Sequence, residues 1–230
     1  MSRHLCLFDL DHTLLPLDSD HTFGSFLVSQ GLADPVEFQK GSDYFYSQYL
    51  ATTLDIHAYI EFTTAPWRHL SAERQRQIQQ SYFDEIIRPH IKPAALDLVR
   101  QHQKRGDLIA IVTATNEFVT RPIANAFDIS DLIAVELERD ENGHATGKID
   151  GTPSYQGGKI ARVQQWLKAQ GLGLEHFESS TFYSDSINDL PLLEQVTHPV
   201  ATNPSPALEE IAHQKGWRIL NLFNDQEIHS

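Results

Sequence analysis

The chain has 230 residues, of which 40% are hydrophobic and 21% charged, a composition typical of folded globular proteins rather than disordered ones. Its 31 acidic and 18 basic residues give a formal net charge of −13. This excess argues against a nucleic-acid backbone or an anionic membrane as the main partner, and an anionic substrate would need a local positive site.

The first predicted element is a buried strand, the apolar run at residues 5–8, which ends directly before Asp9 and Asp11. Residues two apart on an extended chain point the same way, so these carboxylates would lie about 7 Å apart and repel each other. We therefore expect a cation or a shared proton between them. The alternative is that the stretch from Asp11 to Thr13 only begins a turn or a helix.

The lone cysteine, Cys6, lies inside this strand, where a small apolar side chain fits the core. A single cysteine favours a reducing compartment. The apolar stretch at the N-terminus is too short for a signal peptide, and no run of the sequence approaches the length of a membrane span. We expect a cytoplasmic protein, either a monomer or a small homo-oligomer.

A long segment, residues 18–90, has helical rather than strand-like patterning. Gly31 is suited to end one helix, Asp34 followed by Pro35 to begin the next, and Ser71 to open a last helix that stops before Pro89. We expect this segment to form an all-helical cap, with residues 1–17 and 91–230 forming the core.

From Pro93 onward, helical and strand patterns alternate, which is typical of a parallel sheet with helices on both faces. Asn142-Gly143 adds a hairpin turn. The expected helices are 93–106, 117–127, 158–171, 189–196 and 205–216, and the expected strands are 108–113, 132–138, 181–184, 199–203 and 217–222. The predicted fold class is α/β, with a Rossmann-like parallel sheet core and an inserted all-helical cap.

Further polar clusters follow the predicted strands at the same rim as Asp9, where open α/β sheets bind their ligands. They comprise Thr113, Ala114, Thr115 and Asn116, then Lys159 at a helix start, and finally Asp185, Asn188 and Asp189. Each cluster taken alone has a plain explanation as a helix cap, a strand residue or a solvated lysine. Their shared position at one rim of the sheet favours a functional site over these separate explanations.

Carboxylates with a few oxygen neighbours suit Mg²⁺, which prefers hard oxygen ligands. Threonine hydroxyls, the amides beside them and a lysine are suited to binding phosphate. An aspartate can also attack phosphorus and form an aspartyl-phosphate. The combination predicts a site for phosphoryl transfer.

The segments FDLDHTL, IVTATN, Lys159 and YSDSINDLPLL resemble the four motifs of the haloacid dehalogenase superfamily. The helical insertion after the first motif resembles the phosphoserine phosphatase-like branch. Within that branch, DSDH, TATN, QGGK and SDSINDLPLLE are most similar to the histidinol-phosphate phosphatases. One departure is Thr113-Ala114-Thr115, where serine phosphatases usually show Ser-Gly-Gly, and this departure weakens the case for phosphoserine.

The resemblance implies a role for each matching residue. Asp9 would be the nucleophile and Asp11 the general acid and then base, while Lys159 would steady the transferring phosphoryl group. The implied phosphate-binding residues are Thr113, Ala114 and Lys159; the implied Mg²⁺ ligands are Asp9, Asp11 through its carbonyl, and Asp185, supported by Asn188 and Asp189.

The substrate expected from these roles is a small phosphorylated metabolite. Asp18, Asp20 and His21 at the start of the cap, with Asn116 beside the rim, are the candidate substrate residues. Acidic groups there suit a leaving group with a cationic amine, and the resemblance narrows the choice to L-histidinol phosphate, with phosphoserine second.

Phe23 or Trp67 of the cap could stack on the imidazole of that substrate. The plain alternative is that Asp20 caps a helix and Asp18 faces water. For the function as a whole, a phosphomutase and a non-catalytic phospholigand-binding protein stay open. A dehalogenase is disfavoured because its chemistry needs no second aspartate at position 11.

Overall fold

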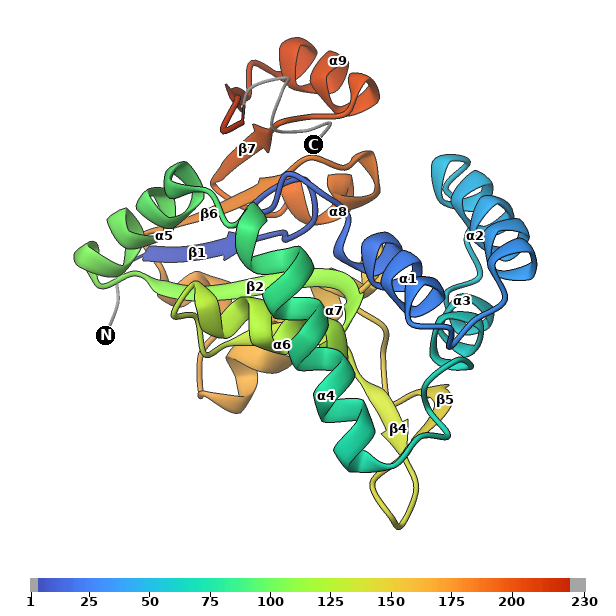
Figure 1. Cartoon of the computed structure of the whole chain (residues 1–230). Helices are drawn as coiled ribbons and strands as arrows, with labels where there is room; N and C mark the ends of the chain where they lie inside the picture. Colours follow the sequence, from blue (N-terminus) through green and yellow to red (C-terminus); the bar gives the residue numbers. More distant parts are fainter. Residues whose placement is uncertain (1–3, 224–230) are drawn as a thin grey trace.

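The computed structural model describes residues 4–223, and its centre is a six-stranded, all-parallel sheet with the order β3-β2-β1-β6-β7-β8 (Figure 1). The strands are β1 His4–Phe8, β2 Leu108–Asn116, β3 Leu132–Val135, β6 Ser179–Ser184, β7 His198–Thr202 and β8 Arg218–Leu220. The chain order reverses on either side of β1, so the carboxyl end of β1 lies at the switch point where such sheets bind ligands.

Helices cover both faces of the sheet because β1 alternates its side chains between two hydrophobic cores. Phe8 joins a core with residues of α5 Pro93–Arg105 and α6 Glu117–Ala126. Leu7 joins the other core, with residues of α7 Gly157–Ala169, α8 Leu190–Leu193 and α9 Pro206–Lys215. This arrangement confirms the predicted fold class.

The segment between β1 and α5 is helical, as predicted. Its elements are α1 Ser19–Ser29, α2 Pro35–Leu50, α3 Ile56–Thr64 and α4 Ala72–Tyr82, followed by a π-helical turn Phe83–Ile87 and a 3-10 turn Arg88–His90. In Figure 1, α1, α2 and α3 lie beyond the arrowhead of β1. Whether residues 18–90 act as a separate cap stays a prediction.

Two predicted elements differ in the structure. The expected strand 132–138 divides at Glu136: β3 stays in the main sheet, and β4 Leu137–Arg139 pairs antiparallel with β5 Ala145–Ile149. The division occurs because the Leu137 amide donates to the Glu117 carboxylate at 3.1 Å and β5 packs against α3. The expected helix 189–196 is reduced to a 3-10 turn, Ile187–Asp189, and the four-residue α8.

Two helix-interior glycines admit aromatic rings between α1, α2 and α3. A Cβ at Gly41 would lie 2.3 Å from the Phe62 ring, and one at Gly24 would lie 2.5 Å from the Phe38 ring. Those two rings stack on each other with centroids 4.8 Å apart. Within residues 4–223, no helix has the length and apolarity needed to cross a membrane.

We expect Gly41→Ala to destabilise the protein by about 1–3 kcal/mol, because the added methyl overpacks against Phe62. Helix propensity alone predicts the opposite sign, a gain of about 1 kcal/mol. Urea denaturation measures the difference. Gly157→Ala, where a methyl would meet open space, is the control and should leave stability unchanged or raised. A Gly41→Ala protein as stable as the wild type would contradict the close packing.

Candidate active site

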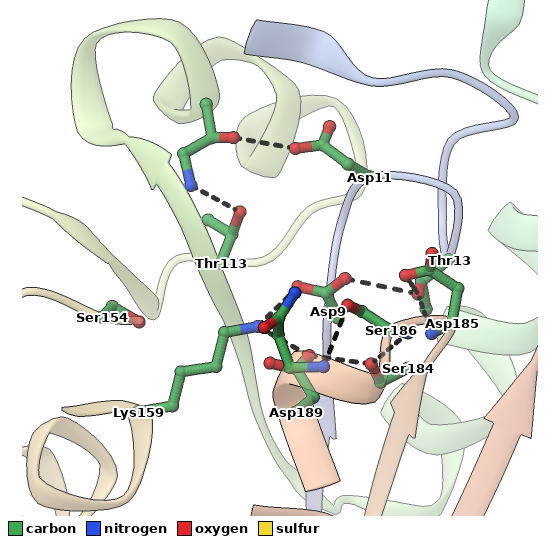
Figure 2. A network of polar contacts seen from close by, with 12 residues as sticks. Asp9, Asp11, Thr13, Thr113, Ser154, Lys159, Ser184, Asp185, Ser186 and Asp189 are labelled. Atoms are coloured by element: carbon green, nitrogen blue, oxygen red, sulfur yellow. Dashed lines mark hydrogen bonds and ion pairs between the residues drawn. The ribbon is translucent and has the colours of Figure 1, made fainter. Parts of the chain in front are cut away.

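A cavity of about 570 Å³ opens at the carboxyl ends of the central strands. Its lining combines predicted rim residues from the core, including Asp9, Thr113 and Lys159, with residues of α1, α2 and α3. Asp9 follows β1 and Asp185 follows β6, so the parallel strands bring residues distant in sequence to one rim (Figure 2).

Lys159, in the first turn of α7, is the positive centre of this rim. Its side chain is 3% exposed, and its Nζ lies 2.8 Å from Asp9 Oδ1 and 2.7 Å from Asp189 Oδ2. Burial disfavours the ammonium, but the carboxylates of Asp189 and Asp9 outweigh it and raise the pKa of Lys159 above its ordinary value. Lys159 is therefore charged and lies between two carboxylates.

Asp11 is held by two donors from different parts of the chain. Its Oδ1 accepts from the Ser19 amide at 2.8 Å, and its Oδ2 accepts from the Thr115 hydroxyl at 2.8 Å. Burial, then the neighbouring charge of Asp18, raise the pKa of Asp11 well above its usual range. A raised pKa makes this carboxyl better suited to act as a general acid.

Thr13 connects the two sides of the rim and was not among the predicted site residues. Its Oγ1 accepts from the Asp185 amide at 3.1 Å and lies 3.3 Å from Asp185 Oδ1 and 3.5 Å from Asp9 Oδ2. Both carboxylates therefore face the space around one hydroxyl. A threonine four residues after the first aspartate was the only sequence signal for this role.

Asp189 is shared between Lys159 and Ser184, whose hydroxyl donates to Asp189 Oδ2 at 2.7 Å. Burial raises the pKa of Asp189 to about 6, although the Lys159 charge lowers it. Asn188 accepts from the Gln156 side-chain amide at 3.3 Å. Figure 2 shows the Asp189 carboxylate between the Lys159 ammonium and Ser184.

Thr113 and Ala114 line the cavity, as predicted for phosphate-binding positions. The Thr113 hydroxyl accepts from the Thr115 amide at 3.1 Å, which orients it at the rim. Thr113 lies inside β2 and not at its end, because β2 continues three residues beyond the expected strand 108–113, to Asn116, through a register shift.

The acidic residues at the start of the helical segment have roles opposite to those of the plain alternative, in which Asp20 caps a helix and Asp18 faces water. Asp18 is the N-cap of α1 and accepts from the amides of Asp20 and His21, both at 2.9 Å. Asp20 is 7% exposed, and burial, then the charge of Asp18, raise its pKa to about 7. All three side chains line the cavity, and His21 is largely exposed.

Three predicted substrate contacts are corrected. Asn116 is not among the residues that line the cavity: it is 1% exposed, and its Oδ1 caps α6 by accepting from the Val119 amide at 3.2 Å. Phe23 and Trp67 are also absent from the lining. They are buried in the hydrophobic core, where Trp67 stacks on Phe118 with centroids 4.2 Å apart.

The donor set fits a divalent cation. Among the described residues, no three His, Cys, Asp or Glu side chains form a metal site by themselves. Two carboxylates, Asp9 and Asp185, with the Asp11 carbonyl would make a smaller protein set, which suits Mg²⁺ because it keeps waters and substrate oxygens. Burial, then the charge of Asp9, raise the pKa of Asp185, and a bound cation would oppose both by favouring the ionised carboxylate.

Comparison with known proteins agrees with this geometry. Residues 6–194 match the family model described as haloacid dehalogenase-like hydrolase. The chain therefore belongs to the haloacid dehalogenase-like hydrolase family, which confirms the resemblance predicted from its motifs.

Particular relatives span nearly the whole chain. A histidinol-phosphatase of Neisseria meningitidis serogroup C (strain 8013) is 42% identical over 220 residues, which are 96% of this chain and 99% of the relative. A solved structure of a protein with unknown function from Bordetella pertussis Tohama I is 47% identical, with a TM-score of 0.91, and covers 97% of this chain and 100% of its own. A substrate-bound phosphoserine phosphatase complex, 15% identical with a TM-score of 0.67 over 96% of this chain and 93% of its own, shares the fold.

We expect Lys159→Met to destabilise the protein by about 3–5 kcal/mol, because Asp9 and Asp189 would then be buried without a cation. Chemical denaturation in EDTA measures the change. Lys168→Met, an exposed position near the end of the same helix, is the control and should change stability by less than about 0.5 kcal/mol. Equal stability of the Lys159→Met and wild-type proteins would show that the ion pairs contribute nothing.

Proposed function

We propose that this hydrolase is a Mg²⁺-dependent phosphomonoesterase that works through an aspartyl-phosphate on a small amine-bearing metabolite, with L-histidinol phosphate as its substrate. The observation that carries the proposal is that Asp9, Asp11 and Lys159 line the same cavity as Asp18 and Asp20. The expected phosphoryl site and the acidic residues at the start of α1 thus share one cavity.

The chain's own groups account for both half-reactions. Asp9 would attack phosphorus while the bond to the leaving oxygen breaks and Asp11 gives its proton to the departing alcohol. In the second half, Asp11 takes a proton from water, whose oxygen attacks phosphorus and releases inorganic phosphate from Asp9. The raised pKa of Asp11 supports this acid role. Thr113 and Lys159 would bind the phosphoryl oxygens.

Asp9, Asp185 and the carbonyl of Asp11 would hold the Mg²⁺, with Asn188 and Asp189 supporting them. When bound, the ion would neutralise negative charge on the phosphoryl oxygens and on the nucleophile. Lys159 would then keep Asp9 Oδ1 in place, leaving its Oδ2 directed to the side of Thr13 and Asp185.

We expect Asp9→Asn to abolish turnover, because an amide is a poor nucleophile and a poor Mg²⁺ ligand. Asp11→Asn should slow both formation and hydrolysis of the phospho-enzyme by about 10²–10⁴-fold, because each step needs a proton transfer. Quenched-flow measurement with L-histidinol phosphate, whose alkyl alcohol needs a proton to leave, with Mg²⁺ and with EDTA, tests both. Substantial turnover by Asp9→Asn, or by the wild type in EDTA, would overturn the mechanism.

The substrate assignment depends on the cap end of the cavity. Asp18 and Asp20 have no lysine, arginine or histidine partner within 4.0 Å among the ion pairs of the described residues. Carboxylates in a partly closed cavity favour a cationic leaving group over a neutral or anionic one. The histidinol-phosphatase name of the Neisseria relative supports the same substrate.

Phosphoserine is the second candidate, because it has the amine and because phosphoserine phosphatases share the fold. It also has a carboxylate, which the acidic end of the cavity would repel. Thr113-Ala114-Thr115 in place of Ser-Gly-Gly also disfavours it.

We expect kcat/KM for L-histidinol phosphate to exceed the values for phosphoserine and for a panel of sugar phosphates by at least about tenfold, which corresponds to about 1.4 kcal/mol. Phosphate-release assays under one set of conditions measure this. If histidinol phosphate is not preferred, the substrate assignment fails while the phosphatase assignment stands. Steady transfer of phosphate to a second alcohol instead of water would favour a phosphomutase.

A further inference from the structure

Asp20 is a buried carboxyl for which the fold alone gives no reason. It is 7% exposed and lines the cavity, and the Tyr59 phenol beside its carboxyl lowers the Asp20 pKa against the larger effect of burial. Unlike Asp18, it caps no helix. A buried carboxyl without a cation lowers stability, so its presence in a cavity points to a ligand.

Thr63 is a second, independent observation at the same place. It follows Tyr59 by four residues, so both side chains lie on one face of α3. Thr63 is 8% exposed and lines the cavity, and its Oγ1 has no hydrogen-bond partner in the structure. A buried hydroxyl without a partner lowers stability, and a methyl group in its place would not. Packing therefore does not account for the hydroxyl.

Aromatic rings form the walls beside these polar groups. Phe45 contacts the Tyr59 ring edge-on, with centroids 5.4 Å apart, and contacts the Phe62 ring at 5.3 Å. All three rings line the cavity. Flat apolar walls with polar groups among them suit a planar ring that has nitrogen atoms at its edge.

We propose that Asp20, Tyr59 and Thr63 bind the ring nitrogens at the end of the substrate remote from its phosphate. This inference rests on the proposed function. In L-histidinol phosphate those nitrogens belong to the imidazole, which has one N–H donor and one acceptor when neutral. The N–H donates to the Asp20 carboxyl and the other nitrogen accepts from the Thr63 hydroxyl, while Tyr59 holds Asp20 in place. Asp18, the N-cap of α1, is then the partner of the ammonium.

The test compares two substrates that differ in the ring. L-histidinol phosphate has both the amine and the imidazole, whereas phosphoethanolamine has the amine alone. We expect Asp20→Asn and Thr63→Val each to lower kcat/KM for L-histidinol phosphate by about 10–100-fold, mainly through KM. The loss for phosphoethanolamine should be less than about threefold. Asp18→Asn should lower kcat/KM for both substrates by a similar factor.

Two matched variants serve as controls. Thr64→Val removes a hydroxyl that is next in sequence but bonds to the Ile60 carbonyl at 2.6 Å and does not line the cavity. Asp43→Asn makes the same carboxyl-to-amide change at an exposed position of α2. Neither should change the ratio of the two kcat/KM values.

Thermal unfolding separates binding from structural roles. Asp20→Asn and Thr63→Val each remove a group that is costly to bury, so we expect neither to lower Tm. If Tm falls and kcat/KM declines equally for both substrates, the three residues only hold α1 against α3 and the inference is wrong. If the ratio of kcat/KM for L-histidinol phosphate to that for phosphoethanolamine is unchanged in both variants, the inference is wrong as well.

The wild-type measurement distinguishes this inference from the proposed function. No wild-type preference for L-histidinol phosphate over phosphoethanolamine overturns the substrate assignment and the ring-binding role together. A wild-type preference that Asp20→Asn and Thr63→Val both retain overturns only the ring-binding role, and the proposed function stands.

Discussion

The buried ammonium of Lys159, in contact with Asp9 and Asp189, is the interaction on which the rest of the site depends. It joins the first turn of α7 to the end of β1 and to the loop after β6, three parts of the chain that the sheet alone brings near. A lysine is rarely buried unless it is paired, and here the two carboxylates both require it and retain its charge.

More carboxyl groups line the cavity than Lys159 alone can pair with. At the core rim, Asp185 stands beside Asp9 around the Thr13 hydroxyl, which suits a divalent cation and an anionic phosphoryl group. At the cap end, Asp18 and Asp20 suit a cationic leaving group. Under the proposed function, an acidic protein would thus bind an anionic phosphate through a few local positive groups and select the remainder of the substrate through its carboxylates.

The helical segment is connected to the catalytic end through its first residues. The Ser19 amide, at the start of α1, donates to Asp11, and Asp18 one residue earlier caps the same helix. The position of α1 therefore directly affects the hydrogen bonding of Asp11, the proposed general acid. Glycines in α1 and α2 let aromatic rings pack at the far end, where they form walls of the cavity.

The sequence by itself determined the sheet class, the family and the principal rim residues. Strand ends, alternating patterns and motif spacing are local, and parallel strands necessarily bring their carboxyl ends together, so Asp9, Lys159 and Asp185 were predicted as one cluster. Tertiary structure decided what depends on contacts distant in sequence: Thr13 and Thr115 became partners of the carboxylates, while Asn116 became a helix cap. The division of the strand at Glu136 also depends on contacts distant in sequence. The Glu117 side chain of α6 binds the Leu137 amide and β5 packs against α3, so the chain leaves the main sheet, and no local pattern shows either contact.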